Sequence, residues 1–329
     1  MTTYGYTLFT EENGPVELVE LARRAEEAGF DFLAASDHYS PWIPEQKHSA
    51  YVWSVLGAVA AVTERVGLMT MVTCPIMRYH PVVVAQKAAT LGLLSEGRFT
   101  LGLGAGERLN EHVVGRGWPA VTERHEMLSE AIEVIRLLWQ GGDANWRGRH
   151  FTVEDAHVFD LPDEQVPIAV AAGGPVAARL AGRLGDGLIA TEPRSDLVDE
   201  FRAAHQGRGT TWNQIPMCWG EDAGKALERA HHTLRWSALG WKVQSELPNR
   251  VNFAAASAQV RPEDLAESIP TGPDPQPYLD AFEQAVDAGY ENIAVLSVGE
   301  DQEGFLRFWE QELAPALRER ETAGSAAGR

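Results

Sequence analysis

Short apolar runs alternate along most of this chain with segments whose apolar residues recur at helical spacing. The runs are four to seven residues long and end at polar or glycine-rich stretches, a pattern typical of buried strands. The predicted strands cover residues 3–9, 30–36, 66–72, 99–103, 167–171, 187–190, 215–219 and 292–297. The predicted helices cover residues 16–28, 50–64, 82–94, 125–139, 224–239, 277–288 and 303–318, and two more begin near 176 and 196.

Eight strands that alternate with helices predict an α/β fold, a (β/α)8 TIM barrel. We expect residues 1–320 to form one barrel domain, because such barrels use this length as a single domain. The stretches around 141–165 and 240–274 do not fit the repeat, and we expect them to be insertions, the second over the barrel mouth. The tail at 321–329 has little to bury and is expected to be disordered.

Two of the predicted strand ends carry side chains suited to chemistry. The segment after the second strand supplies Asp37, His38 and Trp42, and the segment after the fourth supplies Glu107 and Asn110. In a TIM barrel, catalytic groups project from the carboxyl ends of the strands. These two segments therefore favour a redox enzyme over a binding module.

A glycine turn follows the fifth predicted strand and opens a helix. It consists of Ala172, Gly173, Gly174, Pro175 and Val176. Glycines let the backbone approach a ligand closely, and proline suits the first helical turn. Backbone N–H groups at such a helix start can hold a phosphate, although an ordinary strand-to-helix turn has the same composition.

Composition narrows the class of protein further. Hydrophobic residues make up 44% of the 329, and the formal charge of −19 argues against a nucleic-acid partner. No apolar run approaches the roughly 20 residues that span a bilayer, so no membrane partner is expected. Cys74 and Cys218 are the two cysteines, too few for a disulfide framework. We expect a cytoplasmic protein.

The sequence resembles the deazaflavin-dependent branch of the bacterial luciferase-like family, and within it the group around F420-dependent glucose-6-phosphate dehydrogenase. The resemblance covers nearly the whole chain to about residue 195 and returns weakly from Asp274. The motifs that carry it are Ser-Asp-His at 36–38 with Trp42, Arg-Tyr-His-Pro at 78–81, the run at 104–111 and Ala-Ala-Gly-Gly-Pro at 171–175.

The resemblance implies coenzyme F420, an 8-hydroxy-5-deazaflavin, as the hydride carrier, with FMN as the alternative cofactor. It implies that His38 is the base for the hydroxyl proton, Glu107 the acid near N1 of the ring and Trp42 a stabilising wall. An unperturbed imidazole pKa of about 6.5 suits the first role. From the residues alone, His38 could be a loop residue, Glu107 a helix cap and Trp42 a packing residue.

Further cofactor contacts are implied by the same resemblance. Asp37 would fix the cofactor's hydroxyls or the local geometry, Asn110 would contact the cofactor, and the turn at 172–176 would bind its phosphate. The peptide between Met71 and Val72 would be cis, forming a bulge behind the ring. Cys74 either lines this pocket or is an ordinary buried cysteine. The resemblance also implies a homodimer that joins through surface helices near the start of the barrel.

The second half of the chain lacks the cations that the sugar-phosphate enzymes use to hold their substrate. Arg194 is the basic residue at the first of three expected positions, Glu267 occupies the second, and residues 277–291 contain no lysine or arginine. An uncharged alcohol or carbonyl compound is therefore the better prediction for the substrate. Tryptophans would suit an apolar pocket for it: Trp219, Trp236 and Trp241.

Several other functions remain open from the sequence. They are an FMN-dependent luciferase-like monooxygenase, a true F420-dependent sugar-6-phosphate dehydrogenase, a non-catalytic flavin-binding relative and a non-redox barrel enzyme. The last would need a metal cluster or a Schiff-base lysine, and Asp37 and His38 lack partners for a metal cluster, so no metal is expected. The pair of His38 and Glu107 argues against a silent relative.

Overall fold

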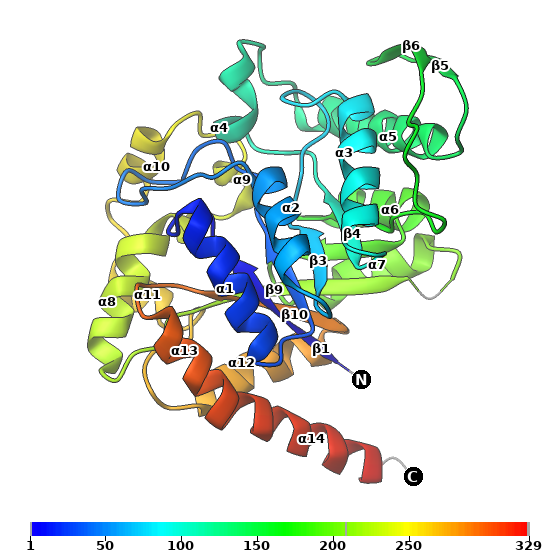
Figure 1. Cartoon of the computed structure of the whole chain (residues 1–329). Coiled ribbons are helices and arrows are strands. Elements are labelled where there is room, and N and C mark those ends of the chain that lie inside the picture. The colour runs from blue at the N-terminus through cyan, green and yellow to red at the C-terminus, as the bar shows by residue number, and fades with distance from the viewer. Residues whose placement is uncertain (1, 208, 328–329) are drawn as a thin grey trace.

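A computed structural model describes residues 2–207 and 209–327 of the chain as a closed barrel of parallel strands surrounded by helices (Figure 1). The order of strands around the described barrel is β1-β10-β9-β8-β7-β4-β3-β2. Its strands are β1 (Thr3–Leu8), β2 (Phe32–Ala35), β3 (Gly67–Thr70), β4 (Phe99–Leu103), β7 (Ile168–Ala171), β8 (Gly187–Ala190), β9 (Thr210–Met217) and β10 (Asn292–Ser297). The predicted (β/α)8 fold is confirmed.

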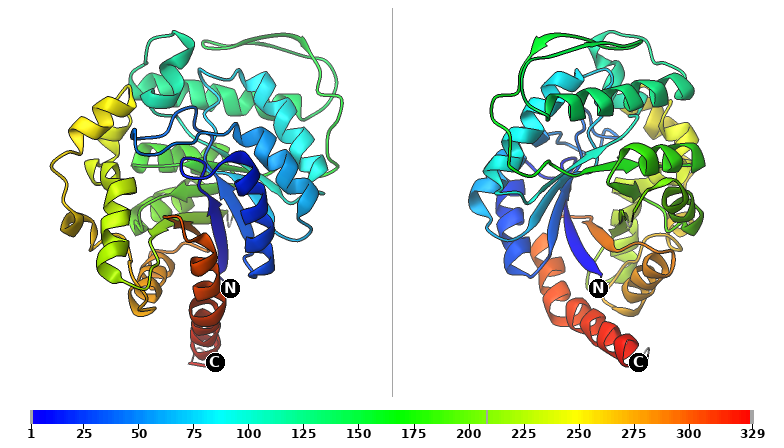
Figure 2. Two further views of the ribbon diagram at one scale, coloured as in Figure 1. Left: turned by 60° about the vertical axis from the view of Figure 1, so that its left-hand side comes forward. Right: turned by 90° about the vertical axis from the view of Figure 1, so that its right-hand side faces the viewer.

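Helices cover the outside of the barrel between successive strands (Figure 2). The main ones are α1 (Pro15–Glu27), α2 (Val52–Val62), α3 (Pro81–Leu94), α5 (Val121–Leu138), α6 (Pro175–Leu184), α7 (Ser195–Ala204), α8 (Ala223–Leu234), α12 (Gln276–Asp287), α13 (Gln302–Phe308) and α14 (Ala314–Ala327). Local signals in the sequence place several ends: Gly29 (φ +85°) follows α1, and the His80 side chain caps α3 by accepting from the N–H of Val82.

Two elements differ from the sequence-based expectation. Strand β9 begins at Thr210, five residues earlier than predicted, because the buried positions in its first half are the polar residues Thr211 and Asn213, which leave no apolar run to detect. The helix expected to end near Leu239 stops at Leu234, and a 3₁₀ segment, η2 (Arg235–Leu239), follows it. The remaining barrel elements lie within a few residues of the predicted ranges.

The two predicted insertions have different structures. Residues 141–165 contain an antiparallel hairpin of β5 (Ala144–Arg147) and β6 (Thr152–Ala156) beside α5. Residues 240–274 contain three short helices: α9 (Trp241–Gln244), α10 (Arg250–Ala256) and α11 (Pro262–Leu265). The carbonyl of Ser245 accepts a 3.0 Å hydrogen bond from the N–H of Arg108 in α4 (Arg108–Glu111), which follows β4. The second insertion therefore reaches the loop after β4.

The C-terminal segment is helical where the sequence led us to expect a disordered tail. Helix α13 continues through a π-helical turn, η3 (Trp309–Leu313), into α14, which reaches Ala327; residues 328–329 lie outside the described residues. Alanine, arginine and glutamate are strong helix formers and explain the extension. Figure 2 shows α14 projecting from the barrel on the side of the N-terminus. Over the described residues, no helix has the length and apolar character needed to cross a membrane.

Candidate active site

His38 follows β2 and is held from behind by a carboxylate that the sequence analysis missed. Nδ1 of His38 forms a short hydrogen bond with Oε1 of Glu11, which follows β1. The Glu11 side chain is 1% exposed, whereas that of His38 is 13% exposed, so the carboxylate that anchors the ring lies deeper than the ring itself. A glutamate on Nδ1 fixes which ring nitrogen carries hydrogen and leaves Nε2 free to exchange a proton.

The pKa of the His38 imidazole is raised above its ordinary value. Burial acts to lower it, but the charge and hydrogen bond of Glu11, together with the charge of Glu107, outweigh the burial and the repulsion from Arg78. A raised pKa means that the surroundings stabilise the imidazolium form. The ring is thus built to accept a proton.

Glu107 lies across from His38 and is held by Asn110. Oε1 of Glu107 is 3.8 Å from Nε2 of His38 and accepts a 2.5 Å hydrogen bond from Nδ2 of Asn110. Glu107 occupies the N-cap position of α4, but its side chain makes no capping hydrogen bond, so the alternative reading as a helix cap is not what the structure shows. Its side chain is 11% exposed and is free to serve a ligand.

Asn110 also ties the two loops together. Its Oδ1 accepts hydrogen bonds of 2.7 Å from the backbone N–H groups of Tyr39 and Ser40, immediately after His38. The side chain is 1% exposed and is occupied on both ends by protein partners. The contact with a cofactor that the resemblance implies stays a prediction for Asn110.

A buried charged triad of Asp37, Arg78 and Glu111 underlies both loops. Arg78 bonds to the carbonyl and to Oδ1 of Asp37, the latter at 3.1 Å, while its backbone N–H donates to Glu111 Oε2 at 3.0 Å and its Nε to Oε1 at 3.4 Å. Burial, helped by Glu107 and Asp37, raises the pKa of Glu111 to about 7 even though Arg78 acts to lower it. The triad joins the loop after β2 to the loop after β4.

Asp37 has protein partners on both of its carboxylate oxygens. Besides Arg78 they are the indole of Trp53 (2.8 Å), the hydroxyl of Thr73 (2.8 Å) and the hydroxyl of Tyr79 (3.1 Å). Two roles were expected for Asp37: to hold the cofactor's hydroxyls or to fix the local geometry. These contacts favour the second role.

Trp42 belongs to an aromatic wall beside His38. Its indole stacks on Trp236 with ring centroids 4.1 Å apart and an interplanar angle of 11°. His38 and Phe253 make T-shaped contacts with the Trp42 ring, with centroid distances of 5.1 Å and 5.2 Å. Trp236 comes from η2 and Phe253 from α10, so the second insertion builds part of this wall. Trp219, by contrast, packs against Phe308 of α13.

The end of β3 has the backbone feature that the resemblance implied. The peptide bond between Met71 and Val72 is cis. Val72 lies against Gly104 of the β4 end, where a Cβ would meet its Cγ2 at 2.7 Å. Cys74 is 4% exposed and packs behind Gly106, so the structure supports its reading as a plain buried cysteine.

The glycine turn after β7 is open to solvent. Gly173, Pro175 and Val176 are exposed, Ala172 is buried, and Gly174 is the N-cap of α6 without a side-chain capping bond. Trp241 of the insertion approaches Gly173 so closely that a Cβ there would meet its Cδ1 at 2.8 Å. The exposed start of a ten-residue helix suits an anionic group.

Arg194 is not part of the His38–Glu107 cluster. It is the N-cap residue of α7, after β8, and its guanidinium is paired with Asp196 at 3.0 Å and 2.5 Å. Glu192 and Glu267 are exposed. Arg194 is therefore already neutralised by its own helix.

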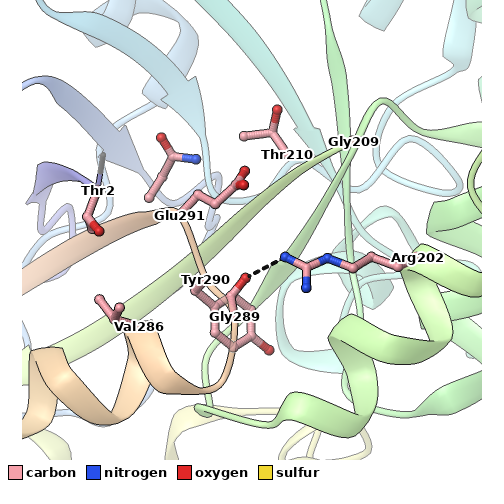
Figure 3. A pocket seen from close by; sticks show the side chains of 9 residues that line it. Thr2, Arg202, Gly209, Thr210, Val286, Gly289, Tyr290 and Glu291 are labelled. Atoms are coloured by element: carbon pink, nitrogen blue, oxygen red, sulfur yellow. Dashed lines mark hydrogen bonds between the residues drawn. The ribbon is translucent and has the colours of Figure 1, made fainter. Parts of the chain in front are cut away.

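A separate cavity of about 480 Å³ lies at the opposite end of the barrel, where β9 and β10 begin (Figure 3). Arg202 crosses it and donates to the carbonyl of Gly289 at 3.2 Å. Its lining residues are Thr2, Arg202, Gly209, Thr210, Val286, Gly289, Tyr290, Glu291 and Asn292. In TIM barrels the amino-terminal face serves stability rather than catalysis.

This chain matches known proteins over nearly its whole length. The family model for luciferase-like monooxygenases matches residues 2–307. The chain is 35% identical to an F420-dependent glucose-6-phosphate dehydrogenase of Microbacterium testaceum (strain StLB037), over 96% of this chain and 98% of that protein. It is 37% identical to the protein of that name from Kineococcus radiotolerans (strain ATCC BAA-149 / DSM 14245 / SRS30216), over 95% and 96%.

Solved structures show the same fold. An F420-dependent secondary alcohol dehydrogenase in complex with an F420-acetone adduct superposes with a TM-score of 0.86 at 28% identity, covering 94% of this chain and 97% of that one. The coenzyme F420-dependent tetrahydromethanopterin reductase from Methanopyrus kandleri follows with a TM-score of 0.77 at 21% identity, over 96% and 99%. The family model and the full-length relatives agree, and this chain belongs to the luciferase-like monooxygenase family.

Proposed function

We propose that this protein is an F420-dependent oxidoreductase that acts on a small, uncharged alcohol or carbonyl compound. The observation that carries the proposal is the facing pair of His38 and Glu107, 3.8 Å apart at the carboxyl end of the barrel, with Glu11 behind the imidazole. Two kinds of relative support it. The protein of Microbacterium testaceum, which aligns over 96% of this chain, and the solved structure with a TM-score of 0.86 are both named as F420-dependent dehydrogenases.

The residues present fit this cofactor. Gly174 leaves the start of α6 open for a phosphate, because a Cβ there would meet nothing within 4 Å, whereas Trp241 lies against Gly173. Met71 and Val72 lie at the end of β3 next to the β4 end that carries Glu107. When bound, F420 supplies a ring carbon that accepts or donates a hydride.

The protein's own task is to move protons beside that carbon. His38 accepts the hydroxyl proton of an alcohol at Nε2, and Glu11 stabilises the resulting imidazolium through Nδ1. With the cofactor bound, Glu107 would be the residue that gives a proton to the ring, as the resemblance implies. Asn110 holds Glu107 and the loop of His38 at a fixed distance, because it bonds to both. For carbonyl reduction, the same groups act in the reverse direction.

The substrate side is apolar. The wall of Trp42, Trp236 and Phe253 stands beside His38, and it offers no charge to a phosphate. Arg194 is paired with Asp196, and the nearby Glu192 would repel an anion. A neutral substrate loses no ionic hydration when it enters such a site.

A second candidate is a sugar-6-phosphate dehydrogenase. Its support is specific, because relatives that are 35% and 37% identical are named F420-dependent glucose-6-phosphate dehydrogenases. Under this reading Arg194 would leave Asp196 and bind the phosphate. The absence of basic residues in 277–291 weighs against it.

The test is F420 absorbance with purified protein. Neutral primary and secondary alcohols of increasing size are compared with glucose 6-phosphate, and loss of the oxidised deazaflavin band is followed over time. We expect turnover with a neutral alcohol and little or none with glucose 6-phosphate. Saturable reduction by the sugar phosphate alone would favour the second candidate, and tighter binding of FMN than of F420 in a parallel titration would overturn the cofactor.

The assembly is part of the same proposal: a homodimer joined through α2 and α3, with a cytoplasmic location. Helix α2 carries no charged residue, and α3 carries one, Lys87. The outward side chains are uncharged and include Val62, Val83 and Leu94, which are 43%, 47% and 57% exposed. Such an uncharged face suits a self-complementary interface. Sedimentation as a monomer at micromolar concentration would contradict the dimer.

A further inference from the structure

Lys87 is a charged residue that the mechanism above does not use. It lies on α3, its Nζ is buried, and that nitrogen has no hydrogen-bond partner among the described residues. An amine in such a place costs free energy unless something else stabilises its charge. Three aromatic rings surround it.

The rings form a cage that we define as Tyr51, Trp53 and Tyr79. Nζ of Lys87 lies 3.2 Å from the ring centroid of Tyr79, 4.3 Å from Trp53 and 5.8 Å from Tyr51. Ammonium groups within about 6 Å of a ring face are attracted by its negative quadrupole, by ~0.5–2 kcal/mol. The cage therefore binds the lysine in place of hydrogen-bond acceptors.

Two of the three cage residues also hold Asp37. The indole of Trp53 donates to Oδ2 of Asp37 at 2.8 Å, and the hydroxyl of Tyr79 donates to Oδ1 at 3.1 Å. Asp37 immediately precedes His38 in the chain. A side chain that fixes these rings thus fixes the donors that hold the loop of the proposed base.

We propose that Lys87 is a positioning residue: its ammonium group clamps the rings of Tyr79 and Trp53, and through Asp37 it sets the position of His38. As far as catalysis is concerned, this inference rests on the proposed function. The positioning itself is a property of the protein without ligand.

The charge of Lys87 changes within the physiological range. Burial lowers its pKa to about 7, and Arg78 adds to this, while Asp37 and Glu111 act in the opposite direction. The groups facing it are Tyr51 before α2, Arg78 and Tyr79 before α3, Asp37 after β2 and Glu111 in α4. Below about pH 7 the clamp is charged and holds the rings; above it the clamp weakens.

The first test needs neither cofactor nor substrate. Lys87→Met keeps the length and removes the charge, Lys87→Arg keeps the charge, and Lys225→Met, at an exposed position of α8, is the matched control. Hydrogen exchange of residues 36–42 should be faster in Lys87→Met by about 2- to 30-fold, the equivalent of one cation–π contact. Below about pH 7, where Lys87 is charged, Lys87→Arg and the control should match the wild type. Unchanged exchange in Lys87→Met would overturn the proposal.

The second test uses turnover. Lys87→Met should lower kcat several-fold with little change in KM, and should have a smaller effect in a Tyr79→Leu background, where the ring of Trp53 is the remaining link to Asp37. The ratio of wild-type kcat to that of Lys87→Arg should fall as pH rises through about 7. A flat ratio, or full additivity with Tyr79→Leu, would refute the inference. Failure of the wild type to reduce F420 with any alcohol would refute the proposed function alone, because the exchange result stands without it.

Discussion

The loops after β1, β2 and β4 and the segments after β8 and β9 meet at the same end of the barrel but are built by opposite means. The first group places Glu11, Asp37 and Glu111 almost fully out of solvent and pairs each with a buried partner. The second group contributes the rings of Trp236 and Phe253, which pack on Trp42, and partly exposed charges such as Arg194, which is paired with its neighbour Asp196.

This difference indicates which half of the site can vary. Removing one member of a buried charge pair leaves the other unpaired, at a cost of about 3–5 kcal/mol. A substitution in the half of the site that contains His38 therefore requires a matching substitution of its charged partner. An exposed pair contributes about 0–1 kcal/mol, and an apolar wall accepts other apolar side chains. Substrate preference can therefore diverge among relatives while the reactive centre stays fixed.

The strongest test of the fixed half is His38→Ala. Loss of a general base should slow single-turnover reduction of F420 by about 10²–10⁴-fold. Cofactor affinity, measured by fluorescence titration, should be retained, because Gly173 and Gly174 are untouched. Reduction at the wild-type rate would show that the base lies elsewhere.

Glu107→Gln is the companion variant for the acid. It keeps the size of the side chain and an oxygen that can accept from Asn110, but it cannot hold a proton for the ring. Loss of turnover with unchanged thermal stability is expected, since Glu107 makes no capping bond to α4. A loss of stability alone would restore the helix-cap reading.

Arg78→Met should have the next largest effect, and on folding rather than on rate alone. It leaves Asp37 and Glu111 buried without their cation, so the free energy of unfolding should fall by about 3–5 kcal/mol. Denaturant unfolding at pH 7 measures it. The loss should shrink at lower pH, because Glu111, whose pKa is raised to about 7, becomes neutral there. A loss that is the same at pH 5 and pH 8 would contradict this account of the triad.

The sequence predicted the barrel and the two segments with His38 and Glu107, because both follow strands with clear apolar patterns. Glu11 was missed, although two glutamates directly after the first strand were a usable signal. Its role depends on the barrel bringing β1 beside β2, which no local pattern encodes. For Arg78 the sequence showed only the motif at 78–81 and not the ion pairs. Its two partners, Asp37 and Glu111, come from different loops, which no local pattern brings together.

The apolar wall could be predicted only in part. Trp236 was named as a candidate, and it stacks on Trp42, whereas Trp219 packs on α13 instead. The sequence shows where the tryptophans are. Which side chain each one packs against depends on how η2 and α10 pack, and these elements lie outside the regular strand-helix repeat. The start of β9 was missed for a similar reason, because polar residues such as Asn213 occupy its first buried positions.

A smaller effect is expected from Glu11→Gln. The amide still accepts or donates at Nδ1 of His38 but no longer stabilises the imidazolium, and a hydrogen bond to a charged group contributes about 1.5–3 kcal/mol, or roughly 10- to 100-fold in rate. The pKa of His38 should fall, because Glu11 is a main cause of its rise. The acid limb of kcat/KM should therefore move to lower pH.

The same coupling has a signature in stability. In the wild type the raised pKa of His38 stabilises the fold fully below the unfolded value of about 6.5, and this contribution is lost as pH rises through the folded pKa. Glu11→Gln should flatten that part of the stability profile. Unfolding free energies measured from pH 5 to 9 check it, and an unchanged slope would separate Glu11 from the titration of His38.

The smallest effect, and the one that sharpens the comparison most, is expected from Arg194→Ala. Because Arg194 is partly exposed and already paired with Asp196, its removal should change stability by no more than about 0.5 kcal/mol. For a neutral alcohol, kcat/KM should stay within about twofold, the equivalent of that energy. Asp196→Ala is the matched variant, since it frees the guanidinium without removing it. If Asp196→Ala lowers KM for glucose 6-phosphate and Arg194→Ala raises it, the variable half of the site binds a phosphate and the second candidate function is correct. If neither variant changes turnover of either substrate, Arg194 lies outside the substrate site, and the aromatic wall of Trp42, Trp236 and Phe253 alone determines what the enzyme accepts.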